Sequence, residues 1–295
     1  MQTSSRPQPS KAKVISTHGQ TRLVDCESIS PIRFLHPYFT DQAVSLIMSS
    51  YGGGMVQGDQ VEIEIDCTEN AKLFLGTQSN SRVYKNDQDL TTTQQLRGKV
   101  GPGARTVFLP DPLVLHSGSR FHQQQSWTVA PDAGLLVGEW FQCGRSDSGE
   151  CFAYQEYDSL IEISSEEALW IREAFSSTPN DYSPRQTGRF GDANLMLTLF
   201  AVGEAQALLT RALETLTAGQ REYTQVPVLG EKELRPSPSD LRSLTHLEDR
   251  PVSIFRALGV TRADFDPIWQ ALQTQLASPN WLGIDAQLPM CRQMV

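Results

Sequence analysis

The chain lacks the features that mark several large classes of protein. It carries no basic excess, since 34 acidic against 25 basic side chains give a net charge of −9, which opposes binding to nucleic acid or to an anionic membrane. No apolar run approaches the ~18 residues of a membrane helix, and the polar start, residues 1–13, lacks the apolar segment of a signal peptide. We therefore expect a cytoplasmic protein with neither nucleic-acid nor membrane partners.

Cysteine is also scarce, and its spacing excludes two kinds of stabilised scaffold. The five cysteines are odd in number, lie far apart and form no C-x-x-C pair, which favours neither a disulfide framework nor a structural zinc site. We expect reduced thiols at all five positions: Cys26, Cys67, Cys143, Cys151 and Cys291.

The usual catalytic motifs are missing as well. The chain has no G-x-S-x-G elbow for a serine nucleophile and no H-E-x-x-H metal motif. His116 and His122 would share a face of one continuous strand, but Ser117-Gly118-Ser119 interrupts it and no nearby motif completes a ligand set. An enzyme alternative stays open, a β-structured hydrolase or isomerase that uses His116 and Glu139 as acid and base.

What the chain does contain is a run of glycine, Gly52-Gly53-Gly54-Met55-Val56-Gln57-Gly58, followed by Asp59. So much glycine indicates backbone with positive φ or in very close contact with a neighbour. It is not a phosphate loop, because Asp59-Gln60 stands where such a loop has Lys-Ser/Thr, and an aspartate would repel phosphate. Asp59 can cap a turn through an Asx hydrogen bond or serve as a ligand, and both interpretations stay open.

Short runs with a period of two dominate the first 175 residues and predict strands. In residues 60–67, for example, Val61, Ile63 and Ile65 face inward while the acids between them face solvent. We expect a predominantly antiparallel β body with strands at residues 43–49, 60–67, 71–77, 91–100, 105–109, 121–129, 135–143, 152–163 and 168–175.

Helical spacing follows in two places. Residues 204–218 carry one apolar face and stop at Gly219, and residues 262–277 form a second amphipathic helix that Thr261 caps together with Asp264. The segments 178–189 and 230–240 are expected to be loops. The fold class expected is mainly β, with a large β-helical-like antiparallel or mixed sheet body and two helices toward the C-terminus. We place one domain at residues 13–278, between tails at 1–12 and 279–295.

One acid interrupts an apolar strand. Glu139 lies between Leu135-Leu136-Val137-Gly138 and Trp140-Phe141, so it is expected to be at least partly buried. Burial of an unpaired carboxylate costs several kcal/mol unless a cation, a donor or a wet cavity receives it. Pairing with Arg145 is the plainer alternative to a functional role.

Four motifs in order resemble those of the urease accessory proteins of the UreD/UreH family. The motif residues comprise Gly53, Gly54, Gly58 and Asp59; Thr77, Gln78, Ser79, Ser81, Arg82 and Tyr84; Pro110 and Asp111; and Gly144 and Arg145. The similarity extends over about residues 20–275. The chain departs from the family at Gln57, at Gln60 and in the tail after Ser278.

The resemblance implies a non-enzymatic maturation chaperone rather than a catalyst. Such a protein binds the urease apoprotein together with UreF-type and UreG-type accessory proteins, and nickel passes through it to the urease active site. It implies Asp59, Glu139 and Glu173 as transient nickel ligands, Ser79 and Ser81 as channel lining, and no tightly bound cofactor. The helix stripes and C-terminal loops would contact the UreF-type partner, although a metal-independent interaction scaffold remains an alternative.

Overall fold

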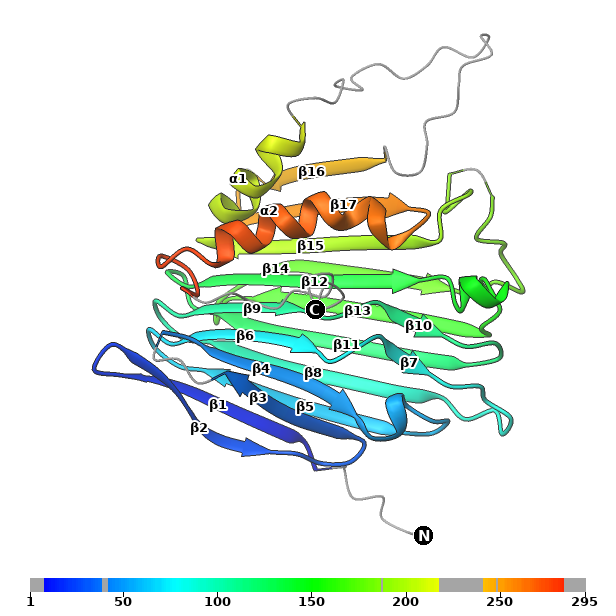
Figure 1. The fold of residues 1–295 in the computed structure, drawn as a ribbon, viewed down its shortest axis with the longest axis horizontal. Coiled ribbons are helices and arrows are strands. Elements are labelled where there is room, and N and C mark those ends of the chain that lie inside the picture. The colour runs from blue at the N-terminus through cyan, green and yellow to red at the C-terminus, as the bar shows by residue number, and fades with distance from the viewer. Residues whose placement is uncertain (1–7, 39–41, 187, 218–240, 248, 284–295) are drawn as a thin grey trace.

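Two large β-sheets lie face to face in this computed structural model, and two helices cover the outer face of one sheet (Figure 1). The structure describes residues 8–38, 42–186, 188–217, 241–247 and 249–283. The mainly β fold expected from the sequence is confirmed.

The seven-stranded sheet has a simple spatial order. From one edge to the other it runs β14 (Leu169–Ser177), β13 (Glu156–Ser164), β11 (Arg120–Val129), β8 (Thr92–Val100), β5 (Gln60–Cys67), β1 (Ser10–Thr17) and β2 (Gln20–Glu27).

The ten-stranded sheet faces it. Its main path runs β16 (Arg242–Leu247), β17 (Val252–Gly259), β15 (Leu195–Gly203), β12 (Gly134–Gln142), β9 (Arg105–Leu109), β6 (Lys72–Thr77), β4 (Val44–Ser50) and β3 (Ile32–Tyr38). The short strands β7 (Ser81–Val83) and β10 (Leu113–Leu115) lie off this path, and β10 pairs with both β7 and β12.

From β4 to β13 the long strands alternate between the two sheets, so this part of the chain winds as stacked coils. Strands β5, β8, β11 and β13 pair in parallel in one sheet, and β4, β6, β9 and β12 pair in parallel in the other. Antiparallel pairing flanks these parallel runs, as in β13 with β14, β3 with β4 and β12 with β15. The expected predominance of antiparallel pairing is therefore wrong, and the sheets are mixed.

The main core lies between the sheets and follows the alternation of side chains. Val61, Ile63 and Ile65 are buried there, while Glu62 and Glu64 lie on the outer side as expected, where both approach Arg97. This alternation sorts the polar and apolar side chains of each strand onto opposite faces.

A second core lies between the ten-stranded sheet and the helices α1 (Ala205–Thr217) and α2 (Asp266–Leu276). Trp140 on the outer side of β12 packs against Trp269 of α2 with 5.1 Å between ring centroids. The 3₁₀ turn Arg262–Phe265 leads into α2, and the predicted capping box of Thr261 and Asp264 is confirmed.

The folded region extends slightly beyond the expected domain at both ends. Strand β1 begins at Ser10, inside the expected tail, and Trp281 and Leu282 are buried against the helices. Residues 178–186 and 188–189 lie outside strands and helices. Gly219, Cys291 and the expected loop at residues 230–240 lie outside the described residues.

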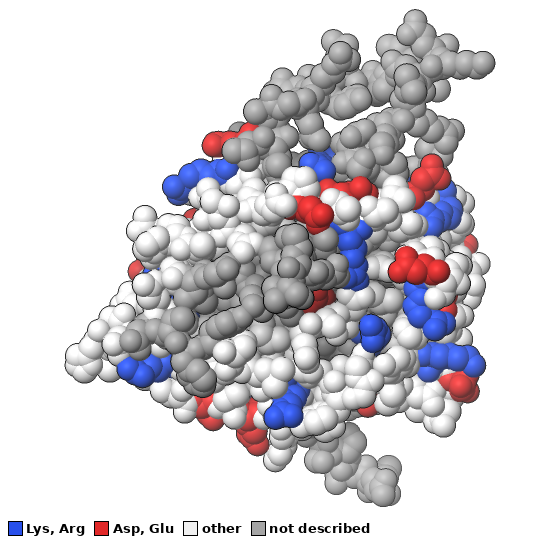
Figure 2. Space-filling model, viewed as in Figure 1, with Lys and Arg blue, Asp and Glu red and all other residues white. Residues whose placement is uncertain are grey.

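Charged side chains of both signs are interspersed on the face shown in Figure 2, where Lys and Arg alternate with Asp and Glu. Within the described ranges, neither α1 nor α2 nor any 3₁₀ turn is long and apolar enough to cross a bilayer.

Candidate functional site

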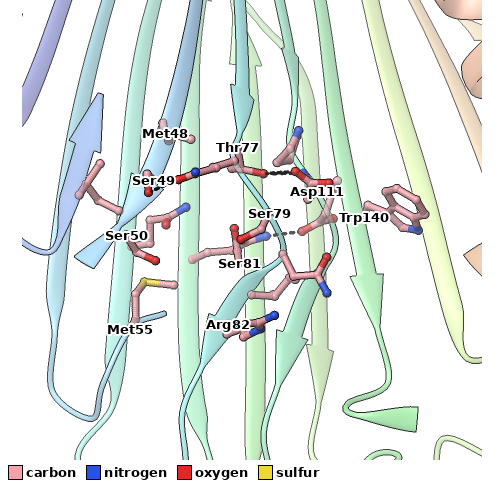
Figure 3. Close-up of a pocket in the computed structure, with 18 of the residues that line it drawn as sticks. Met48, Ser49, Ser50, Met55, Thr77, Ser79, Ser81, Arg82, Asp111 and Trp140 are labelled. Atoms are coloured by element: carbon pink, nitrogen blue, oxygen red, sulfur yellow. Dashed lines mark hydrogen bonds between the residues drawn. The ribbon is translucent and has the colours of Figure 1, made fainter. Parts of the chain in front are cut away.

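A small cavity lies at the ends of β4 and β6 and extends between the sheets (Figure 3). Its volume is about 70 Å³, enough for several water molecules, each of which needs roughly 10–15 Å³ on this measure. The polar side chains that line it are Ser49, Ser50, Thr77, Gln78, Ser79, Asn80, Ser81, Arg82, Gln94, Asp111, Gln123, Gln125 and Glu139. The cavity therefore brings together residues from two of the four sequence motifs, and Met55 from within the glycine run also lines it.

The cavity wall is built where regular strands give way to turns. Thr77 ends β6, and its hydroxyl bonds to Asp111 in the turn between β9 and β10 (Figure 3). Ser79 lies on the short connection to β7, Ser81 begins β7, and both line the cavity. Their role as lining of a nickel channel stays a prediction. Nearby, Ser49 donates to Gln78 at 2.6 Å.

Glu139 is the buried acid of the site. It points from β12 into the space between the sheets, and only 6% of the residue is exposed. Its Oε1 accepts hydrogen bonds from Gln123 at 2.5 Å, from Tyr157 at 3.0 Å, and from Ser159. All three donors are neutral and come from the opposite sheet.

No basic side chain in the described part of the chain forms a salt bridge with Glu139. Arg145 bonds to Glu150 instead, so the pairing of Glu139 with Arg145 that the sequence left open is wrong. Burial raises the pKa of the Glu139 carboxyl, and hydrogen bonds from Ser159, Tyr157 and Gln123 offset part of that rise. Burial likewise raises the pKa of the Tyr157 phenol.

Glu173 lies at a distance from the cavity lining but acts on it electrostatically. It forms an ion pair with Arg256 of β17 at 2.8 Å. Its negative charge adds to the rise in the pKa of Glu139. Of the three predicted nickel ligands, Glu139 alone lines the cavity.

Asp59 closes the glycine run with a turn. Its Oδ2 accepts from the Val56 amide at 2.8 Å, the kind of turn capping that the sequence suggested as one interpretation. Gly52, Gly53 and Gly58 have positive φ. Gly54 has extended backbone instead, and a Cβ there would lie 2.9 Å from the Arg82 carbonyl oxygen. The run thus places Met55 in an isolated parallel β-bridge with Val83.

The Gly144-Arg145 motif lies on a loop after β12 and outside the cavity lining. There Gly144 has φ +141°, and Arg145 contacts Glu150. His116 packs edge-on against Tyr84 at 5.1 Å and likewise does not line the cavity. Since Glu139 is bonded to Gln123, Tyr157 and Ser159, the structure does not support the proposed acid–base pair of His116 and Glu139.

Sequence reasoning missed the donors that hold Glu139. A signal was present on β11, where Phe121 and Trp127 are inward residues and Gln123 and Gln125 occupy the inward positions between them. Two amides at core positions of one strand indicate a polar interior. Arg262 was also missed; it donates to Asn80 at the cavity from the turn before α2.

The fold and site define a class: a two-sheet body of stacked coils with a buried polar cavity and an acid inside it. Within that class, the sequence pattern of the UreD urease accessory protein family matches residues 11–293. The chain belongs to the UreD urease accessory protein family.

Individual relatives carry the same description. The chain is 29% identical over 203 residues to a urease accessory protein UreD of Cytophaga hutchinsonii, covering 69% of this chain and 71% of that protein. It is 31% identical over 203 residues to the UreD of an Anaeromyxobacter species, covering 69% and 68%. A UreD of Actinobacillus pleuropneumoniae is 26% identical over 255 residues, covering 83% of this chain and 93% of that protein.

Proposed function

We propose that this chain binds the urease apoprotein together with UreF-type and UreG-type partners and helps nickel reach the urease active site. Family membership supports the accessory role. The observation that carries the nickel proposal is Glu139, a carboxyl group that is 6% exposed, lines a cavity and has no basic partner within the described chain.

The hydrogen bonds of Glu139 suit a transient ligand. All three donors address Oε1, and no described residue donates to Oε2. One oxygen is thus held in place while the other is available to a cation. Oxygen donors and water bind Ni²⁺ more weakly than a thiolate or imidazole set would, which lets the ion leave again.

Nickel binding at Glu139 should depend on pH. Burial disfavours the charged carboxylate and so raises the pKa of the group. Ni²⁺ binds the carboxylate form, so any proton that Glu139 carries is released on binding, and one of the two positive charges of the ion compensates the carboxylate. Asp59 and Glu173 remain predicted ligands. We consider both less suited to nickel than Glu139, because the Asp59 carboxylate already caps a turn and the Glu173 carboxylate already pairs with Arg256.

The test compares Glu139→Gln with Glu162→Gln, an outward acid on β13 that pairs with Arg172. Each variant replaces the wild-type chain in cells that express urease and its accessory proteins under limiting nickel. We expect Glu139→Gln to lower the nickel content of purified urease several-fold while the chain still co-purifies with it, and Glu162→Gln to leave the content unchanged. Equal nickel content with Glu139→Gln and intact co-purification would show that Glu139 is no transit ligand.

A metal-independent scaffold is the second candidate. The observation in its favour is that the bonds to Glu139 join the two sheets across the core, which is a structural role in itself. That candidate predicts that Glu139→Gln, which preserves hydrogen bonding, matches wild type in nickel content and in partner binding alike.

A further inference from the structure

A second group of potential metal ligands lies on the outer face of the seven-stranded sheet, on the other side of strand β11 from Glu139. His122 of β11 is flanked by Glu156 and Asp158 of β13, and one ligand atom from each lies within 4.8 Å of the other two. Parallel pairing of β11 with β13 makes His122 and Asp158 direct neighbours. These three residues are called the His122 cluster below.

The acids of the His122 cluster differ from other strand acids in their partners. Glu62, Glu162 and Glu173 each pair with an arginine. Within the described residues, Glu156 and Asp158 have His122 as their sole ion-pair partner, because Arg120 beside them is paired with Asp89. Two carboxylates two positions apart on one strand thus face a single imidazole and no arginine or lysine within the described residues.

The imidazole nitrogen between them has no hydrogen bond. His122 Nε2 is shielded from solvent and forms no hydrogen bond of acceptable geometry in the described structure, yet it lies 3.3 Å from Glu156 Oε1 and 3.3 Å from Asp158 Oδ2. An enclosed polar nitrogen normally has a partner. The orphaned atom therefore points to a ligand bound between the three side chains.

The spacing of the donor atoms fits a metal ion. Donors that share one ion through bonds of about 2.1 Å lie roughly 3.0–3.4 Å apart when their angle at the metal is near 90–109°. The two nitrogen–oxygen distances of 3.3 Å fall in this range. The side chains of His122 and Asp158 are both 42% exposed, and both residues line a groove of about 540 Å³ along the sheet, so the ion and its waters have access.

We propose that the His122 cluster is a binding site for a first-row divalent metal ion of intermediate softness, the class of Ni²⁺ and Zn²⁺. One imidazole and two carboxylates supply three ligands, and water completes the coordination sphere. Imidazole is what distinguishes the site from an acidic patch, because Mg²⁺ and Ca²⁺ prefer oxygen ligands. The site is separate from the Glu139 cavity and does not depend on the function proposed above.

The test titrates the full-length protein with NiCl₂, ZnCl₂ and MgCl₂ by calorimetry at neutral pH. His122→Asn is compared with His18→Asn, because His18 is exposed and has φ +53°, a conformation that asparagine tolerates. We expect His18→Asn to match wild type, and His122→Asn to lose one equivalent of Ni²⁺ or Zn²⁺ or to weaken it at least tenfold. Asp158→Asn should weaken the same equivalent.

Two further measurements distinguish loss of the metal site from other effects of the substitutions. Glu139→Gln should retain the equivalent that His122→Asn loses, which separates this site from the cavity whatever the outcome for urease. Circular dichroism and thermal unfolding should show that His122→Asn is folded, and if it is not, Asp158→Asn decides. The proposal is overturned if the folded variant, His122→Asn or in its place Asp158→Asn, titrates like wild type, or if Mg²⁺ binds the His122 cluster as tightly as Ni²⁺.

Discussion

Thr77 and Asp111 hold each other through two reciprocal hydrogen bonds. The Thr77 hydroxyl donates to Asp111 Oδ2 at 2.9 Å and accepts from the Asp111 amide at 2.7 Å. Both residues are buried, and they join the end of β6 to the turn that follows β9. This pair fixes one wall of the cavity and connects two motifs that are 34 residues apart.

Removal of the Thr77 hydroxyl should destabilise the protein. Thr77→Val keeps the shape of the side chain but removes both hydrogen bonds, so the Asp111 amide loses its acceptor and the Asp111 carboxylate loses a donor. We expect this to cost about 1–3 kcal/mol of unfolding free energy. Thr77→Ser keeps the hydroxyl and should stay closer to wild type. Urea unfolding followed by fluorescence measures both, and identical midpoints for the two variants would contradict the structural role of the pair.

Glu139→Gln should change how stability depends on pH. The pKa of Glu139 is raised in the folded protein above its ordinary value of 4.5. At a pH between these two pKa values, the carboxyl is more protonated in the folded protein than in the unfolded chain. The stability that comes from the protonated carboxyl is complete below the ordinary value and falls as pH rises through the folded pKa. Glutamine does not titrate, so Glu139→Gln should gain stability relative to wild type as pH rises.

Urea midpoints across that pH range measure the effect. Thr77→Ser serves as the control, since it leaves the carboxyl in place and should follow the pH dependence of the wild type. A constant difference between Glu139→Gln and wild type at every pH would show that burial does not raise this pKa.

Two substitutions of Asp59 should separate its structural role from its predicted role with nickel. Asp59→Ala removes the acceptor for the Val56 amide, a loss of about 1 kcal/mol by comparison with other side-chain caps. Asp59→Asn keeps an acceptor oxygen and should retain most of the stability.

The nickel content of urease then decides what else Asp59 does. If the residue only caps the turn, Asp59→Asn should support urease as wild type does. If nickel content falls with Asp59→Asn while the unfolding midpoint holds, the carboxylate has a role beyond the turn.

Gly54→Ala should destabilise the glycine run by overpacking. The added Cβ would lie 2.9 Å from the Arg82 carbonyl oxygen and 2.9 Å from the Tyr84 ring, and such crowding costs roughly 1–3 kcal/mol. Gly52→Asn is the matched control, because a Cβ at Gly52 meets nothing within 4 Å and asparagine tolerates its positive φ of 73°. Thermal unfolding compares the two variants, and an equal loss at both sites would point to backbone conformation as the cause.

The sequence revealed strands with one buried face but not their direction. Val61, Ile63 and Ile65 alternate in the same way whether the neighbouring strand is parallel or antiparallel, so alternation predicted β5 correctly and left its pairing open. Strand β15 was missed for the opposite reason. It is buried on both faces, between the other sheet and the helices, and Leu195–Gly203 therefore shows no clear alternation.

The candidate site was predictable to a similar extent. Glu139 was identified because an acid in an apolar strand is costly, and its burial is confirmed. Its donors Tyr157 and Ser159 lie on another sheet, and nothing local to β12 indicates which strand faces it. The His122 cluster was missed likewise, because Asp158 becomes its neighbour only through the parallel pairing of β11 and β13.

The alternation of the long strands from β4 to β13 between the two sheets has a consequence for local opening. Each coil touches mainly the coils before and after it, so stability is transmitted as in a linear array of neighbours. Strands β5, β8 and β11 are flanked on both sides, whereas β2 and β16 each have one neighbour. Amide hydrogens should therefore exchange fastest in the end strands and slowest around Glu139, so that the walls of the cavity stay closed while the ends of the molecule open and close.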